Sequence, residues 1–279
     1  MSARTLLPLV LLLSVLCADA GHAAWAACDS AIRKASPDDQ IRLYTLCITN
    51  GQTRNWDIAY ALRGRAYAYV RKGDLDHALE DVNLSLRYNP NNQDAHDLRV
   101  YIYARRMQWD LADQDLTAIV EHTAKRHQAD AYMSRGALRF CVGRCADALH
   151  DVDQALALYP KQPLAYAFKA VILSMCADER VRNGAEALSL ARRALALRDD
   201  WASHSILAVA FAEAGQFTDS VREIGIAETM ASTAGAGKLD LRRLAKARAL
   251  FENAQPYHQR GPEQDCFVEP PESHGEASE

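Results

Sequence analysis

Two residue types recur at one interval in the first half of the chain, and together they could recognise a ligand. Tyr67 and Tyr101 are 34 residues apart, and Arg71 and Arg105 are separated by the same interval. A guanidinium presents a planar fork of N–H donors that matches a carboxylate, and a tyrosine ring beside it adds a stacking surface. If equivalent helices carry these residues, they form a Tyr–Arg stripe that could bind an extended or helical peptide through its carboxylates.

Two phenylalanines could extend this stripe. We expect Phe140 and Phe168 to continue it as an apolar floor. The alternative interpretation is purely structural. In that case each tyrosine packs against its neighbour, and each arginine only ends a helix, where the helix dipole favours a cation.

Clustered acidic residues raise the possibility of acid–base catalysis. They are Asp110, Asp113 and Asp115, and, in the corresponding place one unit later, Asp147, Asp151 and Asp153. Paired carboxylates can act as general acid and base, but acids are also favoured in the solvated first turn of a helix, which is the interpretation we prefer. The sequence has no glycine-rich phosphate loop, serine nucleophile elbow or zinc-protease motif. We therefore expect no enzyme activity and no cofactor.

Six cysteines remain once a predicted signal peptide is removed, and an even number in an exported chain suggests disulfides. They are Cys28, Cys47, Cys141, Cys145, Cys176 and Cys266. We predict a Cys28–Cys47 bond near the start of the mature chain. For the other four we predict one bond within 141, 145 and 176, with Cys266 pairing with the leftover thiol. Zinc and buried free thiols are the alternatives, but the Cys-x₃-Cys spacing lacks a second close ligand pair, so we expect no metal.

Residues 1–20 have the pattern of a secretory signal peptide. Arg4 precedes an apolar stretch from Leu6 to Leu16, and small residues allow cleavage after Ala20 or after Ala23. The stretch is too short to span a bilayer. A lipid anchor at Cys17 and an uncleaved anchor are alternatives. We expect an exported protein that does not insert into the membrane after cleavage.

The composition is that of a soluble globular protein with no electrostatic preference for polyanions. The chain of 279 residues is 49% hydrophobic and 24% charged, and its formal net charge is −4. Paired arginines are too dispersed to form a track for nucleic acid. We therefore expect a protein or peptide partner and no nucleic acid.

Small residues punctuate the chain at nearly even intervals. The anchors are Ala78, Ala112, Ala148, Ala187 and Ser220, with intervals of 34, 36, 39 and 33 residues. Gly73 lies five residues before Ala78 and Pro90 twelve after it, and Gly143 and Pro160 flank Ala148 at the same distances. A period near 34 predicts a stack of helical hairpins.

This period predicts the organisation of the whole mature chain. We expect an N-terminal helical pair over 25–56 and an array over 57–254, ending in a capping helix over 238–254. The repeats fall at about 59–92, 93–126, 129–162, 163–200 and 201–234. Met107 replaces the turn glycine of the second repeat, and the fourth has a long connection from Cys176 to Gly184. A proline-rich, acidic tail over 255–279 is expected to be disordered.

The repeats resemble the tetratricopeptide repeat (TPR) family. That family's unit has an aromatic residue early in its first helix, a small pair mid-helix, glycine before the turn, alanine in the second helix and proline at the end. The third repeat matches with Tyr132, Arg135-Gly136, Gly143, Ala148, Ala155 and Pro160, and the first with Leu62, Ala66, Tyr69, Gly73, Ala78 and Pro90. Ser220 departs from the pattern in the fifth repeat, and the Lys/Asn set of the family's carboxylate-clamp subclass is missing.

The resemblance implies a right-handed, all-α solenoid of helix-turn-helix repeats whose concave face, lined by the first helices, binds a partner. We therefore expect a non-catalytic scaffold for a peptide or protein. Resemblance to short secreted repeat proteins with a leading cysteine pair places it in a bacterial periplasm or outside the cell. An envelope-associated enzyme or accessory subunit, and a self-assembling structural protein, are the alternatives, so a homo-oligomer is also possible.

Overall fold

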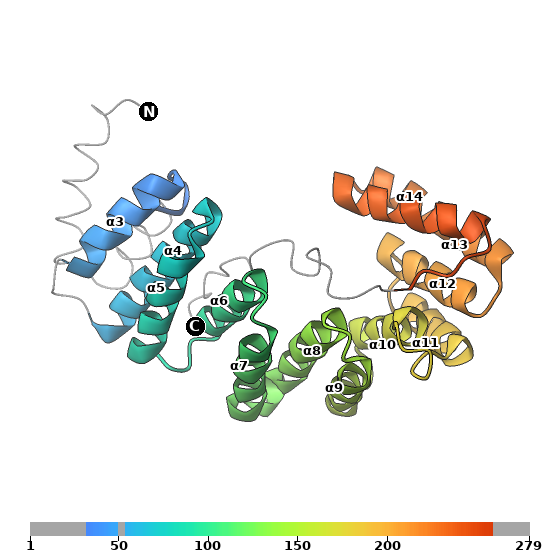
Figure 1. Ribbon diagram of the computed structural model, residues 1–279, viewed down its shortest axis with the longest axis horizontal. Helices are drawn as coiled ribbons and strands as arrows, with labels where there is room; N and C mark the ends of the chain where they lie inside the picture. The colour runs from blue at the N-terminus through green and yellow to red at the C-terminus, as the bar shows by residue number, and fades with distance from the viewer. Residues whose placement is uncertain (1–31, 50–53, 259–279) are drawn as a thin grey trace. The chain divides into compact units, whose positions relative to one another are not determined.

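The computed structural model describes residues 32–49 and 54–258, and these ranges contain twelve α-helices and no strand (Figure 1). The helices are α3 (Pro37–Thr49), α4 (Asn55–Lys72), α5 (Leu75–Tyr88), α6 (Gln93–Arg105), α7 (Trp109–His122), α8 (Lys125–Cys141), α9 (Cys145–Leu158), α10 (Pro163–Met175), α11 (Gly184–Leu197), α12 (Trp201–Glu213), α13 (Phe217–Thr233) and α14 (Lys238–Glu252). None of these helices is long and apolar enough to cross a membrane. The predicted all-α solenoid of helical hairpins is confirmed.

The helices end where the sequence supplies residues that suit a helix terminus. Gly73, Gly143 and Gly215 have positive φ angles of 80°, 83° and 75°, the left-handed conformation that closes a helix before a reversal. Five helices begin after a side chain that accepts a hydrogen bond from a backbone N–H in the first turn. These caps are Ser36, Asp74, Asn92, Asn183 and Asp200. Local backbone chemistry therefore fixes the boundaries of most hairpins.

The second repeat makes the same reversal without glycine. Met107 has φ 57° and follows Arg106, the residue that caps the end of α6. A side chain with a Cβ adopts this conformation at a cost of about 1–2 kcal/mol. The reversal is thus imposed by the packing of the hairpin rather than by the local sequence.

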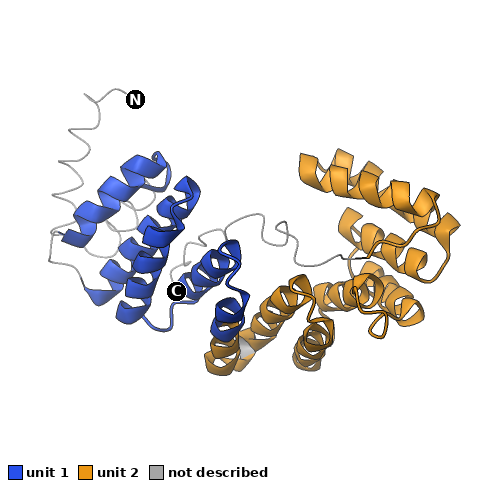
Figure 2. Ribbon diagram, viewed as in Figure 1, with its two compact units in different colours: residues 1–115, 267–279 blue, residues 116–266 orange. Residues whose placement is uncertain are grey.

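The chain divides into two compact units (Figure 2). Unit 1 holds the described residues up to Asp115, and unit 2 holds those from Leu116 onward. In unit 1, α4 packs against α3 and α5, and α5 packs against α6. In unit 2, the pairs α8–α9, α10–α11 and α12–α13 form hairpins, and α14 packs against α13.

The predicted small anchors lie inside the packed hairpins. Ala78, Ala112, Ala148, Ala187 and Ser220 are all completely buried. Ser220 fits a polar group into this position because its hydroxyl donates to the carbonyl oxygen of Ala208, 2.6 Å away. Only small side chains allow the two helices of a hairpin to come this close.

The last helix covers the apolar end of unit 2. Leu244, Ala247 and Phe251 of α14 pack against Ala212 and Ile224, which belong to α12 and α13. A repeat array needs such a helix, because its final hairpin otherwise leaves an apolar face in water. Helix α14 lies within residues 238–254, the range predicted for a capping helix.

Two expected boundaries differ from those observed. The first helix of the array begins at Asn55, inside the range assigned to the N-terminal helical pair. The disordered tail expected from residue 255 is wrong for 255–258: Tyr257 packs beside α14, and His258 Nε2 lies 2.7 Å from Glu213 Oε2. Residues 259–279, like the signal segment 1–20, lie outside the described residues.

One of the alternative cysteine pairings is present. Cys145 and Cys176 form a disulfide that joins the start of α9 to the residue after α10. It anchors the start of the long connection from Cys176 to Gly184 in the fourth repeat. Cys47 and Cys141 are buried. Because Cys28 and Cys266 lie outside the described residues, the pairings that involve them stay predictions.

Candidate functional site

The predicted Tyr–Arg stripe lies on the first helices of the two hairpins in unit 1. Tyr67 and Arg71 belong to α4, and Tyr101 and Arg105 belong to α6. Tyr67 packs against the same hydrophobic cluster that contains Tyr101, so the structure brings the two rings into one surface. Tyr101 is nearly buried, whereas both arginines are exposed.

The two arginines are held in place without an anionic partner. Arg71 Nη1 lies 3.3 Å from Gln40 Oε1. The Arg105 guanidinium lies 5.9 Å from the centre of the Tyr101 ring, and Nη1 is 3.4 Å from the Tyr101 hydroxyl. Among the described residues, neither guanidinium forms an ion pair with a carboxylate. Both therefore keep N–H donors available for a carboxylate from another molecule.

The opposite end of this surface is acidic and poorly solvated. Burial raises the pKa of the Asp97 carboxyl from its usual value to about 6, with the Gln93 amide opposing the rise and Asp94 adding to it. Burial also raises the pKa of Tyr67, whose hydroxyl is shielded from water and makes no hydrogen bond in the described part of the chain. The surface thus carries positive charge at the Arg71 and Arg105 end and a partly desolvated carboxyl at the Asp97 end.

The two phenylalanines belong to unit 2, whereas the Tyr–Arg stripe belongs to unit 1. Phe140 and Phe168 meet edge to face, with ring centres 5.8 Å apart, inside the cluster built from α8, α9 and α10. Phe140 is 8% exposed. The two rings therefore contribute to core packing. Their role as a floor for a bound peptide stays a prediction.

A repeated ion pair was not anticipated from the sequence. Each of three successive hairpins joins an arginine of its first helix to an aspartate of its second helix, sixteen residues later, through two N–H donors. The pairs are Arg65–Asp81 (2.7 and 2.6 Å), Arg99–Asp115 (2.7 and 2.5 Å) and Arg135–Asp151 (3.1 and 2.7 Å). We call these the Arg–Asp pairs.

The Arg–Asp pairs correct one expectation. Asp115 and Asp151 were assigned to a solvated first turn, but they are 7% and 0% exposed and are paired. Desolvation alone would raise the pKa of Asp115, but the His96 and Arg99 side chains outweigh it and hold that pKa below the usual value. Asp110 and Asp147 remain exposed as expected. The buried carboxylates are therefore structural, because each is neutralised by a guanidinium from its own hairpin.

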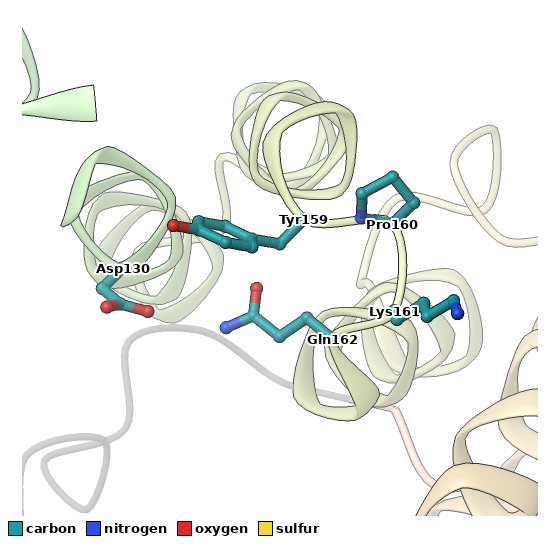
Figure 3. Close-up of a pocket in the computed structure, with 5 residues that line it drawn as sticks. All are labelled: Asp130, Tyr159, Pro160, Lys161 and Gln162. Atoms are coloured by element: carbon teal, nitrogen blue, oxygen red, sulfur yellow. The ribbon is translucent and has the colours of Figure 1, made fainter. Parts of the chain in front are cut away.

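Unit 2 contains an open cleft of about 700 Å³ (Figure 3). Its lining residues come from the start of α8 and from the turn between α9 and α10: Asp130, Tyr159, Pro160, Lys161 and Gln162. In Figure 3 the Tyr159 ring and the Gln162 amide lie on two sides of one space, Asp130 lies beside them, and Lys161 points away. No motif in the sequence predicts this cleft, since a tyrosine and a glutamine around Pro160 carry none.

No metal site was found in the described residues, which contain no group of three His, Cys, Asp or Glu side chains able to hold an ion.

No family model matches the sequence, and no curated protein matches it. Solved structures do match. A tetratricopeptide repeat protein from Parabacteroides merdae ATCC 43184 is 17% identical, with 84% of this chain and 86% of that chain covered and a TM-score of 0.55. A thermophilic TPR protein from Thermus thermophilus is 18% identical, with coverage of 67% and 97% and a TM-score of 0.52.

This chain has the TPR fold. The assembly chaperone of RpL4, Acl4, is another structure of this kind, at 11% identity, with 82% of this chain and 95% of that chain covered and a TM-score of 0.52. Identities this low establish the fold and no activity. Within the TPR hairpins, the surface on α4 and α6 and the cleft near α10 are the two candidate sites for a partner.

Proposed function

We propose that this TPR protein is a non-catalytic scaffold that binds a peptide segment of a partner protein on the surface formed by α4 and α6. The exposed guanidiniums of Arg71 and Arg105, which lack a carboxylate partner in the described part of the chain, carry this proposal. They would pair with acidic side chains or a terminal carboxylate of the partner. Tyr67 and Tyr101 would supply the apolar contact between them.

Two features support this role over a purely structural one. Most other arginines on the first helices of unit 1 are already neutralised, as Arg63, Arg65 and Arg99 show. Arg71 and Arg105 are not paired with a carboxylate in the described part of the chain. In addition, Acl4 shares the fold and is by name an assembly chaperone for another protein.

The test is a selection of peptides from a random display library, comparing the parent protein with the double variant Arg71→Glu, Arg105→Glu. We expect the parent to enrich peptides with acidic residues and the variant to bind those peptides at least about tenfold more weakly. The matched control is Arg42→Glu, Arg87→Glu, which makes the same charge change at exposed positions of α3 and α5. Equal loss of binding in both doubles would refute the assignment.

We further propose that the protein is exported and works in an oxidising compartment such as a bacterial periplasm. The support is the Cys145–Cys176 disulfide together with the signal-like residues 1–20, since structural disulfides persist mainly outside the cytosol. Cell fractionation with N-terminal sequencing checks this proposal. A protein that keeps Met1 and stays in the cytosol would contradict it.

A further inference from the structure

Unit 1 contains a complete binding site for a guanidinium that the chain fills itself. The side chain of Arg63, only 2% exposed, is held by three groups of different kinds. Its Nη1 donates to the side-chain oxygen of Asn92, 3.2 Å away, and pairs with the Asp94 carboxylate. Its Cζ lies 4.7 Å from the centre of the Tyr60 ring. An amide oxygen, a carboxylate and a tyrosine ring thus surround a buried arginine.

The same place in the third repeat lacks the arginine. The first and third repeats are 70 residues apart, as Ala78 and Ala148 show, and this offset relates Arg63 to Met133 and Asn92 to Gln162. It also relates Tyr60 to Asp130. Met133 packs into the core formed by α8, α9 and α10. No resident cation therefore occupies this position in the described part of unit 2.

The cleft of Figure 3 lies at the corresponding turn of the third repeat, and its lining offers the same three kinds of group, although Leu164 stands where the offset places Asp94. Gln162 Oε1 is shielded from solvent and accepts no hydrogen bond in the described part of the chain. Asp130 is exposed and forms no ion pair with a described residue. Tyr159 is 45% exposed and presents its ring to the same space as the Gln162 amide.

We propose that this cleft binds the guanidinium of an arginine side chain supplied by a partner protein. The Asp130 carboxylate would neutralise the charge, Gln162 Oε1 would accept an N–H, and the Tyr159 ring would stack on the plane. A planar guanidinium fits this set better than an ammonium, because it can stack on the ring while it donates in its own plane to the two oxygens. Lys161 points away from the space and does not oppose the cation.

This inference does not depend on the proposed function of the surface on α4 and α6, since it concerns different residues in the other unit. The probe is the peptide acetyl-Gly-Arg-Gly-amide, titrated into the full mature chain and followed by NMR chemical shifts. We expect the backbone signals of residues 159–163 and Asp130 to move. The neutral isostere acetyl-Gly-citrulline-Gly-amide should leave them in place, and the lysine peptide should bind at least about tenfold more weakly.

Variants make the assignment specific to the cleft. Asp130→Asn should weaken binding of the arginine peptide about tenfold or more, whereas the exposed control Glu121→Gln on α7 should not change it. Gln162→Leu removes the unpartnered acceptor and should also weaken binding of the arginine peptide. The double variant Arg71→Glu, Arg105→Glu should bind the probe as the parent does, which separates this proposal from the previous one. Equal shifts with the citrulline peptide, or full binding by Asp130→Asn, would overturn it.

Discussion

Asp97 shows how one side chain can report the solvation of the surface on α4 and α6. Its carboxyl lies on α6 between Gln93 and Tyr101, one helical turn from each, and burial raises its pKa to about 6. The charged groups around it are Asp94, His96 and Asp115, of which only the imidazole can oppose the rise. Ionised Asp97 therefore destabilises the folded state at neutral pH.

The sign of the resulting pH dependence follows from linkage. The folded state holds the Asp97 proton more tightly than the unfolded chain, so stability falls as the pH rises from about 4 to about 6 and then stays level. We expect Asp97→Asn to remove this fall and to be stabilised relative to the parent by about 1–3 kcal/mol more at pH 7 than at pH 4. Urea unfolding at the two pH values measures it.

The comparison needs a carboxylate on the surface as its control. Asp110→Asn, at an exposed position in the first turn of α7, should follow the pH profile of the parent. If Asp97→Asn also follows that profile, burial does not raise the pKa of Asp97 as described. The surface would then be better hydrated than the buried Tyr67 hydroxyl indicates.

At the scale of helices, the Arg–Asp pairs connect each hairpin to the one before it. Besides its aspartate, each arginine donates to a polar side chain on the preceding helix. These contacts are Arg65 to Thr45 (2.9 Å), Arg99 to Asn83 (2.9 Å) and Arg135 to Thr117 (3.2 Å). Hydrophobic surfaces can slide past one another, but a hydrogen bond of fixed geometry cannot. The Arg–Asp pairs therefore set the register between successive hairpins.

Removing the most buried carboxylate should be costly. Asp151 on α9 is fully buried and accepts from both Arg135 and Arg139 on α8. Asp151→Asn leaves two guanidiniums with no buried counter-charge, so we expect a loss of about 3 kcal/mol in the free energy of unfolding. Denaturant unfolding checks the value. Asp147→Asn on the same helix removes an exposed carboxylate and should cost less than about 0.5 kcal/mol; equal losses would contradict the argument.

What the sequence could predict depends on whether the cause is local. Gly73, Gly143 and Ala148 predict hairpins because a left-handed turn and a close helix contact each require one kind of residue. The pairing of Asp151 was missed because it depends on which face of a helix meets its neighbour. The sixteen-residue interval between arginine and aspartate, repeated three times, was the signal that could have revealed it. The four residues of the Tyr–Arg stripe lie on α4 and α6, and the binding role of the stripe stays a prediction.

The cleft near α10 could not be predicted from the third repeat alone, because that repeat has Met133 where the first repeat has Arg63. Met133 is an ordinary core residue by itself and becomes informative only beside Arg63, seventy residues earlier. The difference between the two repeats is visible only when one is set against the other, since no motif marks it. The predicted start of the array at residue 57 differs from the observed start of α4 at Asn55. Gly73 marks the C-terminal end of this helix in the sequence, but no comparable residue marks its N-terminal end.

At the scale of the whole molecule, stability is distributed among neighbours. Helices of the described chain pack mainly against the helices next to them in sequence, so each hairpin depends on the adjacent ones. The last hairpin, α12–α13, packs on one side against the preceding hairpin. On its other side only the capping helix α14 covers it. Loss of that helix should therefore be felt first in α12 and α13 and only weakly farther along the array.

Leu244→Ala tests this expectation. Leu244 is 4% exposed and packs in the cluster shared by α12, α13 and α14, so truncation should cost about 2–4 kcal/mol locally. Hydrogen exchange should show protection falling in α13 and α14 while α8 and α9 keep theirs. Leu239→Ala in the same helix, where the side chain is 38% exposed, is the control and should change little. A uniform fall in protection from α8 to α14 would instead mean that unit 2 unfolds as a single cooperative block, and that the capping helix supports every hairpin in it.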